Sequence, residues 1–309
     1  MSLSTAKSSD LCGPLHHTLA SQGASAIATF AFFPLDTVKM RFMSQDGTKE
    51  RLHNHTYYRH TFPAIRQIAV SEGVVVLYRG VHVAILGATV AWGVYMYLYR
   101  LLLGHLPRGL ENSFWGAAGS SLLASGASAV FTCPIWLIKT RMQVEEAGRL
   151  AAQTAIHYGT FRGGLRYMIQ TTGYRSLWRG LSAQLLLSVP NCLNVPIYDA
   201  AKRWRRGGVD SEEMSVADVT LCASISKISL SLMTHPFFVI KTRLQDHRSM
   251  LGEVHYMSLH QAVRTTMTRE GVPGLYRGFV PSLMQALPRG AAQFLLYEAF
   301  LSTMRTYLR

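Results

Sequence analysis

Charged residues and cysteines are scarce in this sequence. Charged side chains make up 16% of the 309 residues, apolar ones make up 49%, and the mean hydropathy is slightly positive. This balance is typical of a chain whose surroundings are partly lipid. Because no two cysteines have the spacing of a disulfide framework or a metal site, the sequence predicts neither. The four cysteines lie singly in or beside apolar runs, at Cys12, Cys133, Cys192 and Cys222.

Acidic residues are also few, since 17 Asp and Glu stand against 31 Lys and Arg, a formal net charge of +14. In a soluble protein this excess would suggest a nucleic-acid partner. The sequence has no zinc-ligand spacing, no aromatic RNA-binding signature and no long basic arm, so we expect no nucleic acid. In a membrane protein the same excess suits anionic lipid head groups and anionic substrates. No catalytic triad and no phosphate-binding loop of an NTPase is present, and we therefore predict a non-enzyme without a cofactor.

Long runs without charge predict helices that span a membrane. A helix needs about 20 apolar residues to cross the hydrocarbon core, and only a helix satisfies its backbone polar groups within such a segment. Two runs are interrupted by a single cation, Lys227 in 219–240 and Arg289 in 279–297. Together with the uninterrupted runs they predict an all-α membrane protein with six transmembrane helices. The uninterrupted runs are 18–35, 81–99, 112–138 and 181–198.

Two motifs occur three times each at a nearly constant spacing. Pro-x-x-x-x-Lys-x-Arg begins at Pro34, Pro134 and Pro236, which are 100 and 102 residues apart. Leu-aromatic-Arg-Gly ends at three glycines that are 100 and 98 residues apart, namely Gly80, Gly180 and Gly278. Such a period indicates tandem structural repeats. We predict an N-terminal tail over 1–14 and three repeats over 15–104, 112–203 and 215–305.

Each repeat is expected to contain an apolar helix, a Pro-Lys-Arg elbow, a polar connector, the aromatic-Arg-Gly motif and a second apolar helix. The connectors 43–76, 143–176 and 245–274 are polar and basic, and each ends in an amphipathic stretch such as Thr61–Ser71. We expect these stretches to form short helices on the membrane surface. Because long and short connectors alternate, the three long ones should share one side and both termini the other.

These motifs resemble the signature of the mitochondrial carrier family over essentially the whole chain. That signature is Pro-x-acid-x-x-base-x-base, followed by acid-Gly-x-x-x-x-aromatic-base-Gly, in each of three repeats. The resemblance implies six tilted helices with three-fold pseudosymmetry around one central cavity. It places the protein in the mitochondrial inner membrane, with both termini toward the intermembrane space. The N-terminus lacks an Arg-rich amphipathic presequence, so we expect an internal targeting signal, and we expect a monomer.

The chain departs from this signature at several acidic positions. Asp36 keeps the acid after the proline, but Trp136 and Phe238 replace the other two. In the second repeat Thr172 also stands where the acid-Gly pair has its acid. The resemblance implies that the acid of one repeat pairs with the base of the next to close the matrix side. Asp36 with Lys139 is then the one such pair that this sequence allows. The predicted matrix gate is Asp36, Lys39, Lys139, Lys241, Gln143 and Gln245, with Met43 at the glutamine position of repeat one.

The resemblance implies a second gate on the cytoplasmic side, with the pattern aromatic-acid-x-x-base. This pattern is complete only at Asp199 and Lys202, because Glu298 is followed by Leu301 where the base would stand. We expect Asp199, Lys202 and Glu298 to form the cytoplasmic gate. Both gates are therefore predicted to hold few ion pairs.

Substrate contacts in the family lie seven residues after each aromatic-Arg-Gly glycine. One further helical turn lies on the same face. Gly87 would leave room for a large flat group, and Trp92 would either stack on a ring or pack in the helix bundle. Arg289 would bind the negative charge of a substrate or pair with a helix C-terminus, and Lys227 would reach the cavity or a neighbouring helix. The predicted substrate-binding residues are Gly87, Ala91, Trp92, Leu187, Ser188, Asn191, Lys227, Gln285 and Arg289.

Two further sets of cations follow from the motifs. We expect the lysine of each Lys-x-Arg pair to face the cavity, and the arginines Arg41, Arg141 and Arg243 to divide between the cavity and head-group anchoring. At the start of each even-numbered span, free backbone donors suit a phosphate, and the resemblance implies cardiolipin there. An aromatic belt with an arginine anchor is the alternative. The predicted cardiolipin residues are Arg79, Gly80, Arg179, Gly180, Arg277 and Gly278.

A finer resemblance connects the chain with the folate and FAD carriers and with the pyridine- and pyrimidine-nucleotide carriers. It rests on Pro134-Ile-Trp, on Trp92-Gly-Val-Tyr-Met-Tyr and on Ser226-Lys227-Ile. We therefore predict a secondary transporter that moves an anionic, ring-containing cofactor or nucleotide by alternating access. FAD, folate, NAD and pyrimidine nucleotides are the candidate substrates. A carrier of smaller metabolites, such as carboxylates or amino acids, and a non-transporting membrane adaptor are the alternatives.

Overall fold

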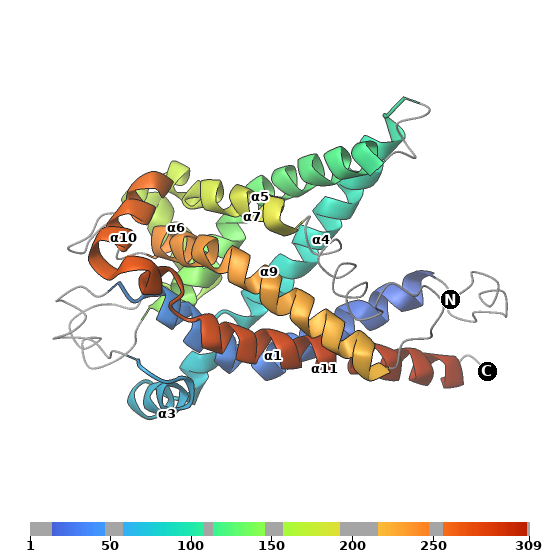
Figure 1. The fold of residues 1–309 in the computed structure, drawn as a ribbon, viewed down its shortest axis with the longest axis horizontal. Helices are drawn as coiled ribbons and strands as arrows, with labels where there is room; N and C mark the ends of the chain where they lie inside the picture. The colour runs from blue at the N-terminus through green and yellow to red at the C-terminus, as the bar shows by residue number, and fades with distance from the viewer. Residues whose placement is uncertain are drawn as a thin grey trace.

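The computed structural model describes residues 14–46, 58–107, 114–145, 157–191, 216–246 and 256–307, and this part of the chain is helical without β-strands (Figure 1). Six helices form the bundle and are called the long helices here, although the described part of α7 has 11 residues: α1 (Pro14–Ser44), α4 (Val81–Gly104), α5 (Phe114–Val144), α7 (Leu181–Asn191), α9 (Val216–Gln245) and α11 (Phe279–Tyr307). The short helices of the connectors are α3 (Thr61–Ser71), α6 (Phe161–Thr172) and α10 (Leu259–Leu275), with 3-10 turns η1 (Val74–Tyr78) and η3 (Tyr174–Trp178). The predicted all-α class is confirmed.

The amphipathic stretch Thr61–Ser71 forms the helix that its pattern predicts. It buries Ala64 and Ile68 against Val38 of α1 and Leu77 of η1. This contact fixes α3 to the end of α1. Burial of such side chains contributes roughly 1.5–3 kcal/mol for each large apolar residue, which exceeds what an isolated helix of this length could supply.

The same backbone turn follows the connector helix in every repeat. Gly73, Gly173 and Gly271 have φ angles of 97°, 79° and 68°, a region that glycine adopts without the strain of a side chain. The residue before each of these glycines is Glu72, Thr172 or Glu270. These three residues therefore occupy equivalent places in the three repeats.

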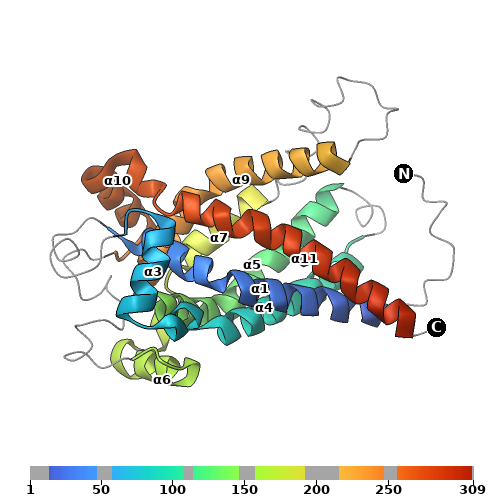
Figure 2. The same ribbon diagram turned by 90° about the horizontal axis from the view of Figure 1, so that it is seen from below.

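Helices from different repeats lie side by side. Helix α1 packs on α11, α4 on α5, and α7 on α9, and α1 also contacts α5 and α9. In two perpendicular views, α3, α6 and α10 lie at one end, whereas the first turn of α1 and the last turn of α11 lie at the other (Figures 1 and 2). This arrangement agrees with the expected alternation of long and short connectors.

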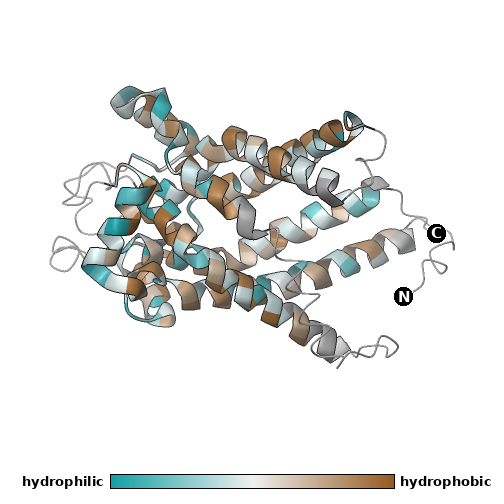
Figure 3. Cartoon of the chain, turned by 45° about the horizontal axis from the view of Figure 1, so that its top comes forward, coloured by the Kyte–Doolittle hydropathy of each residue, from teal (hydrophilic) through white to brown (hydrophobic). Residues whose placement is uncertain are grey.

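The outer faces of the long helices are apolar. Leu86, Tyr97, Phe131 and Leu295 are each more than 60% exposed. Hydrophobic residues run along the long helices, and hydrophilic ones gather at the end that carries the short helices (Figure 3). By length and composition, 74–104 and 119–144 could cross a membrane. Six spans stay a prediction.

The signature prolines do not end their helices. Each of them lies inside a continuous helix, at Pro34, Pro134 and Pro236. The Lys-x-Arg segment that follows each proline is therefore helical and does not form the expected elbow. A proline leaves the carbonyl four residues earlier without its usual donor. In repeat two that carbonyl, of Val130, accepts a hydrogen bond of 3.0 Å from the indole Nε1 of Trp178.

Gly87 lies at the contact between α4 and α5. A Cβ atom at this position would be 3.0 Å from Cγ2 of Ile135 and 3.7 Å from Cζ2 of Trp136. The glycine is buried, and it is absent from the residues that line the central cavity described below. The missing side chain lets α4 and α5 approach closely, which gives Gly87 a packing role, and its part in substrate binding stays a prediction.

We expect Gly87→Leu to lower the melting temperature of the detergent-purified protein. Overpacking a close contact costs roughly 1–3 kcal/mol, and Ile135 blocks the new side chain. Gly93→Leu is the matched control, because a Cβ atom at Gly93 meets nothing within 4 Å and the gain in helix propensity is the same. Equal melting temperatures for the two variants would contradict the packing role.

Candidate functional site

A cavity of about 890 Å³ lies among the long helices. Its volume is near the upper end of the range of about 300–1,000 Å³ found for small-molecule sites. Residues from all six long helices line it, so no single repeat forms the site. The predicted site residues that line it are Asp36, Lys39, Ala91, Trp92, Lys139, Leu187, Lys227, Lys241, Gln245, Gln285 and Arg289.

Several predicted site residues lie elsewhere. Gln143 is buried next to Asp36, just outside the residues that line the cavity. Glu298 is exposed on α11. Asp199 and Lys202, together with the side chains of Ser188 and Asn191, lie outside the described part of the chain.

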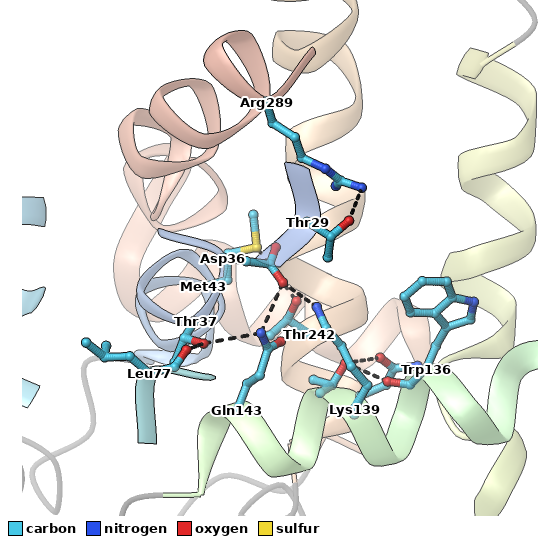
Figure 4. Close-up of polar contacts among 12 residues, drawn as sticks. Thr29, Asp36, Thr37, Met43, Leu77, Trp136, Lys139, Gln143, Thr242 and Arg289 are labelled. Carbon is cyan, nitrogen blue, oxygen red and sulfur yellow. Dashed lines mark hydrogen bonds and ion pairs between the residues drawn. The ribbon is translucent and has the colours of Figure 1, made fainter. Parts of the chain in front are cut away.

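One ion pair joins repeat one to repeat two at the closed end of the cavity. Nζ of Lys139 lies 2.5 Å from Oδ2 of Asp36, and the two side chains are 9% and 15% exposed. The amide Nε2 of Gln143 donates to the same carboxylate oxygen over 3.0 Å (Figure 4). The predicted contact between Asp36 and Lys139 is therefore present, and a bracing glutamine lies beside it.

At the cavity floor, the other two junctions between repeats hold hydrogen bonds between uncharged side chains. Thr140 donates its hydroxyl to Oε1 of Gln245 over 3.1 Å, which joins α5 to α9. Thr242 donates to the sulfur of Met43 over 3.7 Å, which joins α9 to α1. Thioether sulfur is a weak acceptor. The three junctions are therefore unequal, and the one between α1 and α5 holds the ion pair.

An aromatic ring takes the place of one missing acid. Nζ of Lys39 lies 5.6 Å from the ring centroid of Phe238, the residue that stands at the acidic position of repeat three. A cation near an aromatic face is weakly attracted by the ring quadrupole. Lys39 is thus held at the cavity floor by a contact that carries no opposite charge.

The signature arginines are buried, contrary to the expectation that some would anchor head groups. Their side chains are 1–2% exposed, and each Nε donates to a backbone carbonyl of another repeat. A residue two positions from the cavity-facing lysine points away from the cavity in a helix, and this spacing could have predicted the burial. The bonds run from Arg41 to Gln143 (3.1 Å), from Arg141 to Gln245 (3.1 Å) and from Arg243 to Met43 (3.3 Å).

Two of these arginines also bind a carboxylate of their own repeat. Arg41 holds both oxygens of Glu72, and Arg243 holds both oxygens of Glu270. Such bidentate pairs are strong and geometrically specific. They attach the connector helices α3 and α10 to the long helices.

The cavity carries a large excess of positive charge. Asp36 is the acid among its described lining residues, against the five cations Lys39, Lys139, Lys227, Lys241 and Arg289. Nη2 of Arg289 donates to the hydroxyl of Thr29 over 3.0 Å (Figure 4). Its partner is thus a neutral hydroxyl rather than the helix C-terminus that the sequence left open. Unneutralised cations inside a low-dielectric cavity attract anions.

Aromatic side chains of α4 form the wall beside these cations. The indole of Trp92 is 57% exposed and meets the ring of Tyr95 edge-on at 5.7 Å. Tyr95 stacks on Tyr99 at 5.9 Å, and its hydroxyl lies 2.9 Å from the hydroxyl of Ser121. Trp92 and Tyr95 both line the cavity. Because the indole of Trp92 is not fully packed against protein, it remains accessible to a ligand in the cavity.

The family model for mitochondrial carrier proteins matches residues 12–109, 110–208 and 212–308. The chain belongs to the mitochondrial carrier family. This carrier is 30% identical to the chloroplastic folate transporter 1 of Arabidopsis thaliana, with 92% of this chain and 95% of the relative covered. It is 27% identical to the mitochondrial FAD carrier protein of Saccharomyces cerevisiae (91% and 94% covered) and 28% identical to the mitochondrial nicotinamide adenine dinucleotide transporter 1 of the same yeast (93% and 78%). It is a membrane-embedded transporter built of three repeats.

The aromatic-Arg-Gly arginines of this carrier bind protein groups. Arg79 pairs with Glu145 at 3.3 Å, and Nε of Arg277 lies 2.8 Å from Glu270. Arg179 donates to the backbone carbonyl of Tyr256 over 2.6 Å. These contacts favour an inward structural role for the guanidinium groups, which the sequence pattern did not distinguish from lipid anchoring.

At the opposite end, α1 and α11 contact each other through residues that the motif did not include. Nδ1 of His17 lies 2.9 Å from the hydroxyl of Tyr297. Leu301, which stands where the family pattern has a base, packs on Ala20. The pattern of charges carried no signal for these contacts, because they are apolar or uncharged.

We expect Asp36→Asn to destabilise the carrier, because it leaves the mostly buried Lys139 without its counter-charge. The free energy of unfolding should fall by about 3 kcal/mol, as when one partner of a buried pair is removed. Adding Lys139→Met should restore most of the loss, since the buried charge is then gone. Thermal unfolding in detergent of the two single variants and the double variant measures this. A double variant less stable than Asp36→Asn would contradict the pairing.

Proposed function

We propose that this carrier moves an anionic, ring-containing cofactor or nucleotide across the mitochondrial inner membrane by alternating access. The observation that carries the proposal is the combination of five cavity cations against one acid with an exposed indole on the neighbouring wall. Cations would hold the charged part of the substrate and Trp92 its ring. The names of the folate, FAD and NAD relatives support the same substrate class.

Arg289 is proposed to bind the substrate charge first. It shares a wall with Gln285, one helical turn away, and both line the cavity. A substrate carboxylate or phosphate would replace the neutral hydroxyl of Thr29, so no ion pair would have to break. Lys227, on the facing helix α9, would provide a second charge.

Alternating access then requires the closed end to open. In this proposal six helices span the membrane, the end with α3, α6 and α10 faces the matrix, and both termini face the intermembrane space. Opening would break the Asp36–Lys139 pair and the two uncharged junctions. Both charges would become hydrated as this end opens, so separating the pair costs less than removing one buried partner, and binding of a multiply charged substrate can offset the loss. Cardiolipin would bind at the backbone of Gly80, Gly180 and Gly278, because the adjacent arginines are engaged with protein groups.

We expect Arg289→Ala to abolish uptake of FAD, folate and NAD into liposomes while the protein stays folded in detergent. Arg289→Lys should keep part of the activity, because it keeps the charge. Arg264→Ala, which removes an exposed arginine on α10, is the control and should transport like the native protein. Uptake by Arg289→Ala at the native rate would rule out its role.

Trp92→Leu tests the substrate class. Stacking on an aromatic side chain contributes about 1–3 kcal/mol per base, so KM for a ring-containing substrate should rise roughly tenfold. KM for a small dicarboxylate that the carrier accepts should not change. Tyr97→Leu, which changes an exposed aromatic residue of the same helix outside the cavity lining, is the control. A carrier that transports only small carboxylates or amino acids, with no effect of Trp92→Leu, would support the smaller-metabolite alternative.

A further inference from the structure

The three repeats differ at one equivalent position, which holds Glu72, Thr172 or Glu270. In repeat three the carboxylate of Glu270 receives Nη2 of Arg243 over 3.1 Å and Nε of Arg277 over 2.8 Å. In repeat one the carboxylate of Glu72 receives Nη2 of Arg41 over 2.9 Å. In both repeats an acid beside a positive-φ glycine therefore neutralises a buried signature arginine.

Repeat two has the same arginines but no acid at this position. Arg141 is 2% exposed. It donates to the hydroxyl of Tyr158 and to the carbonyl of Gln245, and no carboxylate of the described residues contacts it. Within the described part of the chain, its Nη2 atom is buried without a hydrogen-bond partner, and so is Nε of Arg179. These are the same two atoms that bind the carboxylate in repeat three.

Thr172 does not substitute for the missing carboxylate. Its hydroxyl donates back to the carbonyl of Met168 over 2.9 Å and lies 2.8 Å from the hydroxyl of Ser176. Thr172 is also exposed, whereas the side chains of Glu72 and Glu270 are 3% and 5% exposed. At this position repeat two therefore has an exposed, uncharged side chain, whereas the other two repeats have a buried acid.

The two arginines also repel each other. Burial and the nearby charge of Arg141 lower the pKa of Arg179 from its usual value. The buried guanidinium of Arg141 is costly without a counter-charge, and the charge of the half-buried Arg179 beside it adds to this cost. An anion that reached both would remove this cost.

We propose that Arg141 and Arg179 form an oxyanion-binding site in repeat two, in which a phosphate or carboxylate group takes the place of the acid that the other repeats carry. The bound group would receive Nη2 of Arg141 and Nε of Arg179. It would attach α6 to α5 as Glu72 attaches α3 to α1. This site lies at the connector end of the molecule, separate from the central cavity, and it does not depend on the proposed substrate.

Thermal unfolding of the detergent-purified carrier in inorganic phosphate, against sodium chloride of equal ionic strength, tests the site. Phosphate should raise the melting temperature by about 2–4 °C, the shift expected for a modest gain in stability. Thr172→Glu should raise the melting temperature in chloride and abolish the response to phosphate, because the new carboxylate fills the site. Thr172→Gln, of equal size without charge, should keep the response. If Thr172→Glu does not fold, Arg179→Gln replaces it and should lose the response.

Two further measurements identify the source of the anion and test whether phosphate acts through the central cavity instead. Added phosphatidylglycerol that stabilises the native protein and Thr172→Gln, but not Thr172→Glu, would identify a lipid head group as the occupant. Arg289→Ala should keep the phosphate response, because its change lies in the central cavity. The proposal is overturned if Thr172→Glu responds like the native protein. It is equally overturned if neither phosphate nor lipid has an effect, or if Arg289→Ala alone loses the response.

Discussion

Three buried guanidinium groups hold the repeats of this carrier in a closed ring. Each signature arginine donates from Nε to a backbone carbonyl of another repeat, and the third returns to the first. A guanidinium so deeply buried is costly unless its donors are satisfied. Each repeat therefore depends on a second one to satisfy its arginine, and the cavity exists only when all three are assembled. This explains why residues from every long helix line it.

The charges inside this ring are arranged so that the structure is held without neutralising the cavity. The acids that pair with the signature arginines, Glu72 and Glu270, lie on the outer side of the long helices, in the connectors. On the inner side, one carboxylate faces five cations. With Phe238 in place of an acid, Lys39 contacts an aromatic ring instead of a carboxylate at this position. Apart from the Asp36–Lys139 pair, the ion pairs that stabilise the molecule thus lie away from the cations that attract an anion.

Much of this organisation was predictable from the sequence, because tandem motifs fix equivalent positions. The spacing of the motifs predicted the three repeats, and the amphipathic pattern predicted the helix Thr61–Ser71. Asp36 is the one acid that follows a signature proline at this position, and the sequence therefore also predicted its contact with Lys139. The close approach of Ile135 to Gly87 was not predictable, since a glycine indicates that space is needed but not which group occupies it. The partner of Arg289 was not predictable either, because Thr29 lies 260 positions away and no motif connects the two.

The hydrogen bond between Trp178 and the carbonyl of Val130 makes the three repeats mechanically unequal. Pro134 frees that carbonyl, and the indole of the following 3-10 turn holds it. Among the described residues, no side chain donates to the corresponding carbonyls of Phe30 and Leu232. A helix bends most easily where a backbone bond is missing, so α5 is braced at its proline while α1 and α9 are not. When the closed end opens, α1 and α9 should flex within themselves, whereas α5 should swing as a stiff rod together with the start of α7.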